Sequence, residues 1–136
     1  MSAYNKFNQT VEDLAHKVHD LANDQLAVAL TNTAPTAGNS VLADLTEIDY
    51  TNLSSRDITT VSSGQTAGTY EISLENLTLT ASGGEVGPFR YVVVHNTTPA
   101  GNPLISWFDY GSSITLGDGE SITVDFEEAL RLFELT

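Results

Sequence analysis

The chain has 136 residues, with 18 acidic and 5 basic side chains and a formal net charge of −13. Such an acidic surface repels nucleic-acid phosphates, and the cations are scattered rather than clustered, so we expect no direct nucleic-acid partner. The absence of cysteine from the sequence excludes disulfides and thiolate metal sites.

The length and the hydropathy pattern predict a soluble protein with one core. A chain of this size buries about two-thirds of the surface that it exposes when unfolded, so a single domain needs no covalent staples. No apolar run approaches the roughly 18 residues of a membrane-spanning helix, and residues 1–17 lack the basic and apolar segments of a signal peptide. We therefore expect no membrane partner.

Residues 1–24 are expected to form an N-terminal amphipathic helix packed on the rest of the domain. Within residues 4–22, apolar side chains recur at intervals of four and three: Phe7, Val11, Leu14, Val18 and Leu21. This spacing places them on one stripe of a helix and puts a polar set on the opposite side: Glu12, His16, His19 and Asp20. The pair Asn23-Asp24 then predicts a turn.

Residues 25–136 are expected to form a β-sandwich domain with a long polar connection over residues 32–56. One helical turn is predicted within that connection, near residues 41–45. Strands are predicted over residues 25–32, 58–63, 69–82 (with a phase shift at Asn76), 88–96, 104–111 and 130–136. The pattern favours a mainly β fold, either an antiparallel β-sandwich or a jelly-roll-like barrel, with the N-terminal helix over one edge or end.

The acidic segment Gly117-Asp118-Gly119-Glu120 lies between two short apolar alternations. They comprise Ile114 and Leu116 on one side, and Ile122, Val124 and Phe126 on the other. Two alternating strands joined by a short glycine-containing loop predict a hairpin. A calcium site needs about six to eight oxygen ligands, and this segment lacks the regularly spaced aspartates that would supply them. We interpret it as a hairpin tip, with fortuitous cation binding as the alternative.

The sequence shows no constellation of catalytic or metal-ligating residues. His16 and His19 lie close to Glu12, as in part of a zinc site, but no third strong ligand follows and a solvated helix face is the simpler interpretation. His95 is interpreted as a hydrogen-bonding residue at a strand end. Neither a Gly-x-Ser-x-Gly elbow nor a phosphate-binding loop occurs. We expect no enzyme, no cofactor and no metal, with a carboxylate pair for glycoside chemistry as a distant alternative.

Two strands rich in aromatic residues hold the structural and interface candidates. Arg90 stands in the most apolar run, and Asp109 stands in the similarly apolar "SWFDYG". Because a buried arginine needs a carboxylate, we expect an Arg90–Asp109 salt bridge within or between subunits, with ligand binding as the alternative. Trp107, Phe108 and Tyr110 fall on alternating faces and do not all fit one core, so we expect some of them to face a neighbouring subunit.

Three blocks of the sequence resemble a family of small virion structural proteins of tailed bacteriophages. They are "YNKFNQTVEDLAHKVHDL", "LAVALTNTAPT" and "TASGGEVGPFRYVVVHNTTPAGNPLISWFDYGSSITLGDGESITVDF". The resemblance is less clear over residues 36–60. After the last block, "EEALRL" stands where the family pattern has Asp, Asn and Gly in a tight turn.

The resemblance implies a non-enzymatic virion component, in particular a head decoration (cement) protein on the outer capsid surface, made in the host bacterial cytoplasm. It implies two partners, the major capsid protein and further copies of this chain in a homotrimer. The N-terminal helix and the long loop are expected to act as arms that order on the capsid. A tail or neck ring component is one alternative, and a carbohydrate-binding module that stacks sugars on Trp107 or Tyr110 is another.

Overall fold

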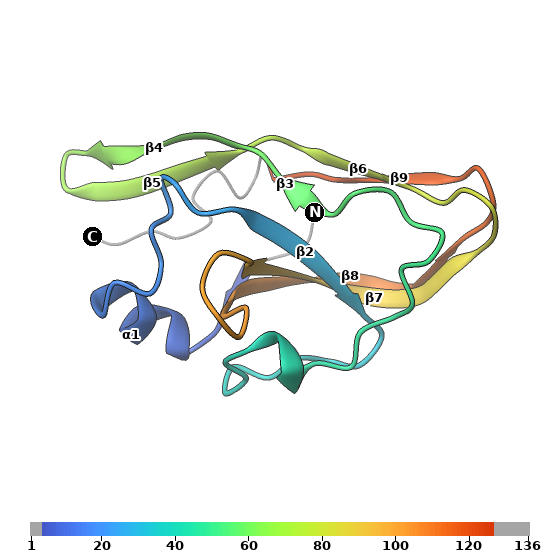
Figure 1. Ribbon diagram of the computed structural model, residues 1–136, viewed down its shortest axis with the longest axis horizontal. Coiled ribbons are helices and arrows are strands. Elements are labelled where there is room, and N and C mark those ends of the chain that lie inside the picture. The colour runs from blue at the N-terminus through green and yellow to red at the C-terminus, as the bar shows by residue number, and fades with distance from the viewer. Residues whose placement is uncertain (1–3, 127–136) are drawn as a thin grey trace.

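The computed structural model describes residues 4–126, which are mainly β (Figure 1). Its elements are, in chain order, β1 (Tyr4–Lys6), α1 (Gln9–Ala15), β2 (Leu26–Thr31), the 3-10 helix η1 (Leu42–Asp44), β3 (Asp57–Ile58), β4 (Thr60–Thr66), β5 (Thr69–Leu74), β6 (Leu77–Thr80), β7 (Val86–Asn96), β8 (Leu104–Leu116) and β9 (Ser121–Val124). The prediction of a mainly β fold with antiparallel strands and one short N-terminal helix is confirmed. The strand predicted over residues 130–136 lies outside the described residues.

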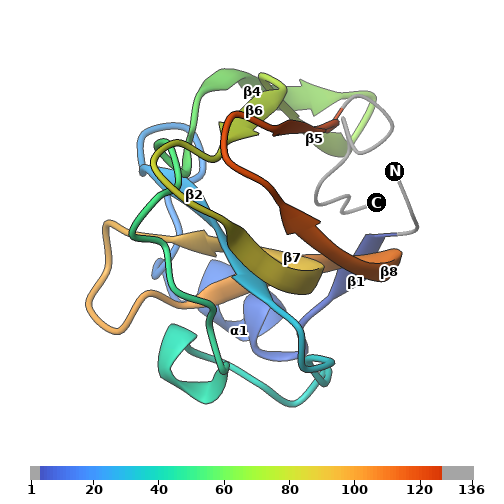
Figure 2. The same cartoon turned by 90° about the vertical axis from the view of Figure 1, so that its right-hand side faces the viewer.

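The strands form one five-stranded sheet and two ribbons of two strands each. The sheet has the order β1-β8-β7-β2-β3, and the ribbons are β4–β5 and β6–β9, with every pairing antiparallel. Both ribbons lie over one face of the sheet, whereas α1 and η1 lie over the other (Figures 1 and 2). Within residues 4–126, β1 and β3 are the edges of the five-stranded sheet, so this sheet is open and the arrangement is layered.

Strands β2 and β7 form the middle of the sheet and are covered on both faces. All six residues of β2 and residues 92–96 of β7 are buried, as their nearly continuous apolar sequences predict. Between the sheet and the ribbons lies the larger core cluster, which includes Val28, Ile72, Leu79, Val92, Phe108 and Val124. On the opposite face lies a smaller cluster of Phe7, Ala29, Val93 and Leu104, with Leu42, Leu45 and Trp107 packed against it.

The N-terminal helix is much shorter than the predicted span over residues 4–22, so that prediction is wrong. The first described residues pair with β8 as β1, and α1 has only seven residues. Just after α1, Lys17 has a φ of 65°, a left-handed conformation that ends a helix. Of the predicted apolar stripe, Phe7 and Leu21 are buried, but Val11 is 43% exposed. Pairing with β8, which is far away in the sequence, has replaced the first turn of the expected helix.

The long connection over residues 32–56 packs on the domain. Its single helical turn, η1, lies where it was predicted. Leu42 and Leu45 contact the smaller cluster, and Tyr50 and Leu53 contact the larger one. These four apolar side chains therefore hold the polar connection against the clusters on both faces of the sheet.

Two strand boundaries differ from the prediction. The alternation over residues 69–82 divides at Glu75 and Asn76 into β5 and β6, which belong to different ribbons. The phase shift thus marks a short connection. In contrast, the segments before and after Gly111 were expected to be separate strands, but they form the single strand β8. Gly111 has a φ of 98°, which glycine adopts without steric cost, so the strand continues through it.

The segment Gly117–Glu120 is a turn between two sheets, so the prediction of a hairpin tip is wrong. Within the described chain, β8 pairs with β7 and β1, whereas β9 pairs with β6. The Glu120 N–H donates to the Gly117 carbonyl oxygen at 2.9 Å, and a Glu120 carboxylate oxygen accepts from the Gly117 N–H at 2.6 Å. Asp118 accepts from the Gly83 N–H at 2.9 Å. The carboxylates of Asp118 and Glu120 therefore stabilise the turn that leads from β8 to β9.

Candidate functional site

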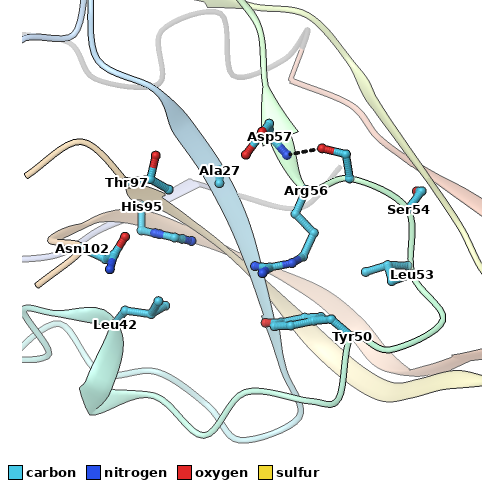
Figure 3. A pocket seen from close by; sticks show the side chains of 11 residues that line it. Ala27, Leu42, Tyr50, Leu53, Ser54, Arg56, Asp57, His95, Thr97 and Asn102 are labelled. Atoms are coloured by element: carbon cyan, nitrogen blue, oxygen red, sulfur yellow. Dashed lines mark hydrogen bonds between the residues drawn. The ribbon is translucent and has the colours of Figure 1, made fainter.

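A pocket of about 430 Å³ lies against β7, β2 and the edge strand β3 of the five-stranded sheet. Its floor comes from β2, β3 and the end of β7, and its walls come from the 42–56 connection and from Asn102 in the loop after β7 (Figure 3). The residues that give the pocket its chemistry are Tyr50, Arg56, Asp57 and His95. The sequence alone predicts a binding role for none of these four residues.

Strand register places His95 on the floor of this pocket. His95 of β7 pairs with Ala27 of β2, and Ala27 pairs in turn with Asp57 of β3, so the three residues share one face of the sheet. Ala27 carries only a methyl group, which leaves room between the two outer positions. The structure therefore brings together residues that lie far apart in the sequence.

His95 is buried without a hydrogen-bond partner. The residue is 3% exposed, and neither ring nitrogen has a partner among the described residues. The prediction that it bonds at a strand end is therefore wrong for the described chain. Burial lowers the pKa of His95 to about 4; the positive charge of Arg56 lowers it as well, and Asp57 opposes them. At pH 7 the imidazole is neutral, so one ring nitrogen donates and the other accepts.

Arg56 is fixed opposite His95 by contacts on two sides. Its Nη1 donates to the Val28 carbonyl oxygen at 2.8 Å, and its guanidinium carbon lies 3.7 Å from the centroid of the Tyr50 ring. The Tyr50 hydroxyl donates to Glu47 Oε1 at 2.7 Å and accepts from the Leu30 N–H at 2.9 Å. Burial, followed by the Glu47 hydrogen bond, raises the pKa of Tyr50 well above its usual value. The aromatic platform under Arg56 is therefore held rigidly against β2.

His19 is buried, which contradicts the prediction of a solvated helix face. Its Nδ1 accepts from the Asn96 side-chain amide at 3.0 Å, and the same amide nitrogen donates to Asp24 at 2.8 Å. Its Nε2 lies 4.0 Å from a carboxylate oxygen of Asp13. Burial lowers the pKa of His19, and Asp13 and Asp24 oppose the shift. By contrast, His16 is exposed, so the two histidines of the sequence motif are not placed together.

Arg90 and Asp109 form the predicted salt bridge, but at the surface rather than in the core. Arg90 Nε donates to Asp109 Oδ1 at 2.8 Å, and Nη2 donates to Oδ2 at 3.1 Å. The two side chains are 39% and 38% exposed, so the expectation of a buried arginine is wrong. The Arg90 hydrogen bond, followed by the Gly111 N–H bond, holds the pKa of Asp109 below its usual value. This bidentate pair links β7 to β8.

The three aromatic candidates of β8 have different environments. Phe108 is buried in the larger cluster, and its ring lies 6.4 Å from that of Phe126. Trp107 packs on Phe7 on the opposite face, with ring centroids 4.6 Å apart. Tyr110 is 41% exposed. The expected division of these residues between two faces is therefore confirmed, and Tyr110 is the one with an exposed ring.

The described part of the chain holds no group of three or more His, Asp or Glu side chains placed to bind a metal ion. Nor does any helix in residues 4–126 have the length and apolar character needed to cross a membrane. Comparison with known proteins gives no match: no protein-family model, no curated protein and no solved structure matches the chain.

Proposed function

We propose that this chain is a non-enzymatic structural protein of a tailed-phage virion, and that it decorates the capsid by bridging major capsid subunits. The observation that supports the proposal is where the residues that resemble the phage family lie in the fold. The longest resembling block, residues 80–126, contains β7 and β8, the strands of 11 and 13 residues around which the main sheet is built. The resemblance therefore lies in the framework of the domain.

The β4–β5 ribbon supports a role in binding another protein. Its first strand is mostly exposed, and Val61 is 64% exposed. Within residues 4–126 the ribbon pairs with no third strand. The edges of a two-stranded ribbon offer backbone groups to which a further strand can bind. A capsid surface that contacts this ribbon would bury Val61 and stabilise the ribbon at once.

The net charge of −13 is compatible with this role. A protein displayed in many copies on one particle must remain dispersed before assembly, and a high net charge opposes non-specific association. The capsid contact must then come from a complementary surface that buries at least about 1,000 Å². The resemblance supports a homotrimer as the binding unit.

Capsid binding tests the proposal. Expanded capsids of the phage that encodes the chain, purified without it, are incubated with the protein and pelleted through a cushion. The proposal predicts saturable co-sedimentation and a higher capsid melting temperature. A chain that stays in the supernatant and leaves capsid melting unchanged contradicts the proposal, and a chain that pellets with isolated tails identifies a tail or neck ring component instead.

A matched pair of variants locates the contact. Val61→Glu places a charge on the β4–β5 ribbon, whereas Val11→Glu places the same charge at an exposed apolar position on α1. Both variants are expected to fold, because both side chains face solvent. Loss of capsid binding by Val61→Glu alone supports the ribbon as the contact; capsid binding by Val61→Glu that equals that of the unaltered protein excludes it.

A further inference from the structure

The pocket beside His95 contains polar groups that form no hydrogen bond within residues 4–126. His95 is 97% covered by its surroundings, yet both ring nitrogens lack a partner among the described residues. Burying a polar group without a hydrogen bond costs stability, so such groups are uncommon in folded domains. Figure 3 shows the imidazole and the Arg56 guanidinium pointing toward each other across the pocket, with Ala27 on the strand β2 near them.

We propose that this pocket binds the carboxylate group of a small organic acid. Of the five N–H donors of the Arg56 guanidinium, one on Nη1 donates to the Val28 carbonyl oxygen. A carboxylate accepts hydrogen bonds at both oxygens, so it suits one N–H from Arg56 and one from the neutral ring of His95. This binding is separate from the proposed capsid contact, since the pocket lies at β2, β3 and β7 rather than at the β4–β5 ribbon.

The charges around the pocket favour a single negative charge on the ligand. Arg56 is the one cationic side chain in the lining, and Asp57 adds a carboxylate to it. Either anion would meet both charges, and the carboxylate of Asp57 repels a phosphate dianion more strongly than a monocarboxylate. A pocket of about 430 Å³ is larger than an acetate ion requires, and Leu42 and Leu53 line it further out. These features fit an acid larger than acetate, whose body meets both apolar and polar side chains.

Benzoate, benzamide and inorganic phosphate are the probes that test this proposal. The imidazole resonances of His95, assigned by their loss in His95→Gln, are followed by NMR during titration of the protein. The proposal predicts saturable shifts with benzoate and at least tenfold weaker binding of benzamide, which has the same shape without the charge. Equal affinities for the two, tighter binding of phosphate, or no saturable shift with any probe would overturn the proposal.

Three variants separate the site from its surroundings. Arg56→Lys keeps the charge but loses the planar fork, and is expected to weaken benzoate binding at least tenfold. Arg90→Lys makes the same change in an arginine outside the pocket and is expected to leave binding unchanged. Ala27→Val fills the floor and is expected to abolish binding, with the fold checked from the amide spectrum. Retained binding by Ala27→Val, in a folded protein, contradicts the assignment of the pocket.

Discussion

Phe7 and Trp107 pack against each other on the face of the main sheet that α1 and η1 cover, with ring centroids 4.6 Å apart and ring planes inclined by 44°. Phe7 follows β1 directly, and Trp107, near the start of β8, pairs with Asn5 of β1. The contact therefore fastens the N-terminal segment to the longest strand. It also takes Trp107 away from the role of an open stacking platform for sugars.

Truncating Trp107 is expected to destabilise the fold. Removal of a large aromatic side chain from a cluster typically costs about 3 kcal/mol or more, so Trp107→Ala should lower the free energy of unfolding by about that amount. Tyr110→Ala, at an exposed position on the same strand, should cost less than about 1 kcal/mol. Urea unfolding of the two variants measures both values. Similar stabilities for the two would show that the Phe7 contact does not support the fold.

Lowering the pH is expected to destabilise the protein through His95. An unfolded histidine has a pKa of about 6.5, whereas burial lowers that of His95 to about 4, with Arg56 adding to the shift and Asp57 opposing it. Between these values the unfolded state binds the extra proton, so the stability is complete above about pH 6.5 and is lost as the pH falls toward 4. The loss attributable to this residue is about 3 kcal/mol.

His95→Gln provides the control for this pH dependence. Glutamine does not titrate, so the variant should lose less stability than the wild type between pH 7 and pH 4.5. The difference is measured by urea unfolding at several pH values. Parallel pH profiles for the two proteins would mean that His95 does not carry the effect.

Gly87 is expected to tolerate no side chain. Its φ is 125°, and a Cβ atom there would lie 2.7 Å from the Ile114 carbonyl oxygen and 3.0 Å from the Thr115 Cα on β8. Backbone strain together with this overlap should cost about 3 kcal/mol in Gly87→Ala. Gly64→Ala is the matched control, because nothing lies within 4 Å of the added atom. Thermal melting that shows equal stabilities for both variants contradicts this prediction.

The Arg90–Asp109 pair is expected to respond to salt. Both side chains are more than a third exposed, so their attraction is screened by solvent and by ions. A double-mutant cycle with Arg90→Gln and Asp109→Asn should give a small stabilising coupling at low salt that disappears at about 1 M salt. A coupling of the same size at both salt concentrations would mean that the pair is shielded from solvent.

The sequence predicts the sheet better than it predicts the N-terminal segment. Period-two alternation and a buried apolar run mark β2 and β7 because a strand buried on both faces needs them. The spacing from Phe7 to Leu21 fits a helix equally well, but Lys17 turns into the left-handed region and β8 captures the first residues as β1. Tertiary pairing thus overrides a periodic signal of moderate length.

The sequence did not predict the candidate pocket, because the pocket depends on which strands are neighbours in the sheet. His95, Ala27 and Asp57 come together only because β2 lies between β7 and β3, and strand order is invisible in a single sequence. One signal was present: His95 follows Val93 on the same face of an otherwise apolar strand. The hairpin prediction for Gly117–Glu120 failed similarly, since neighbouring strands in sequence belong to different sheets.

The position of this chain in a density map of the intact virion tests the proposed function most directly. The proposal predicts density for the β domain on the outer capsid surface, in groups of three between neighbouring capsomers, with the β4–β5 ribbon toward the major capsid protein. Density for the domain in the tail or neck, or a virion that lacks the chain, would contradict it.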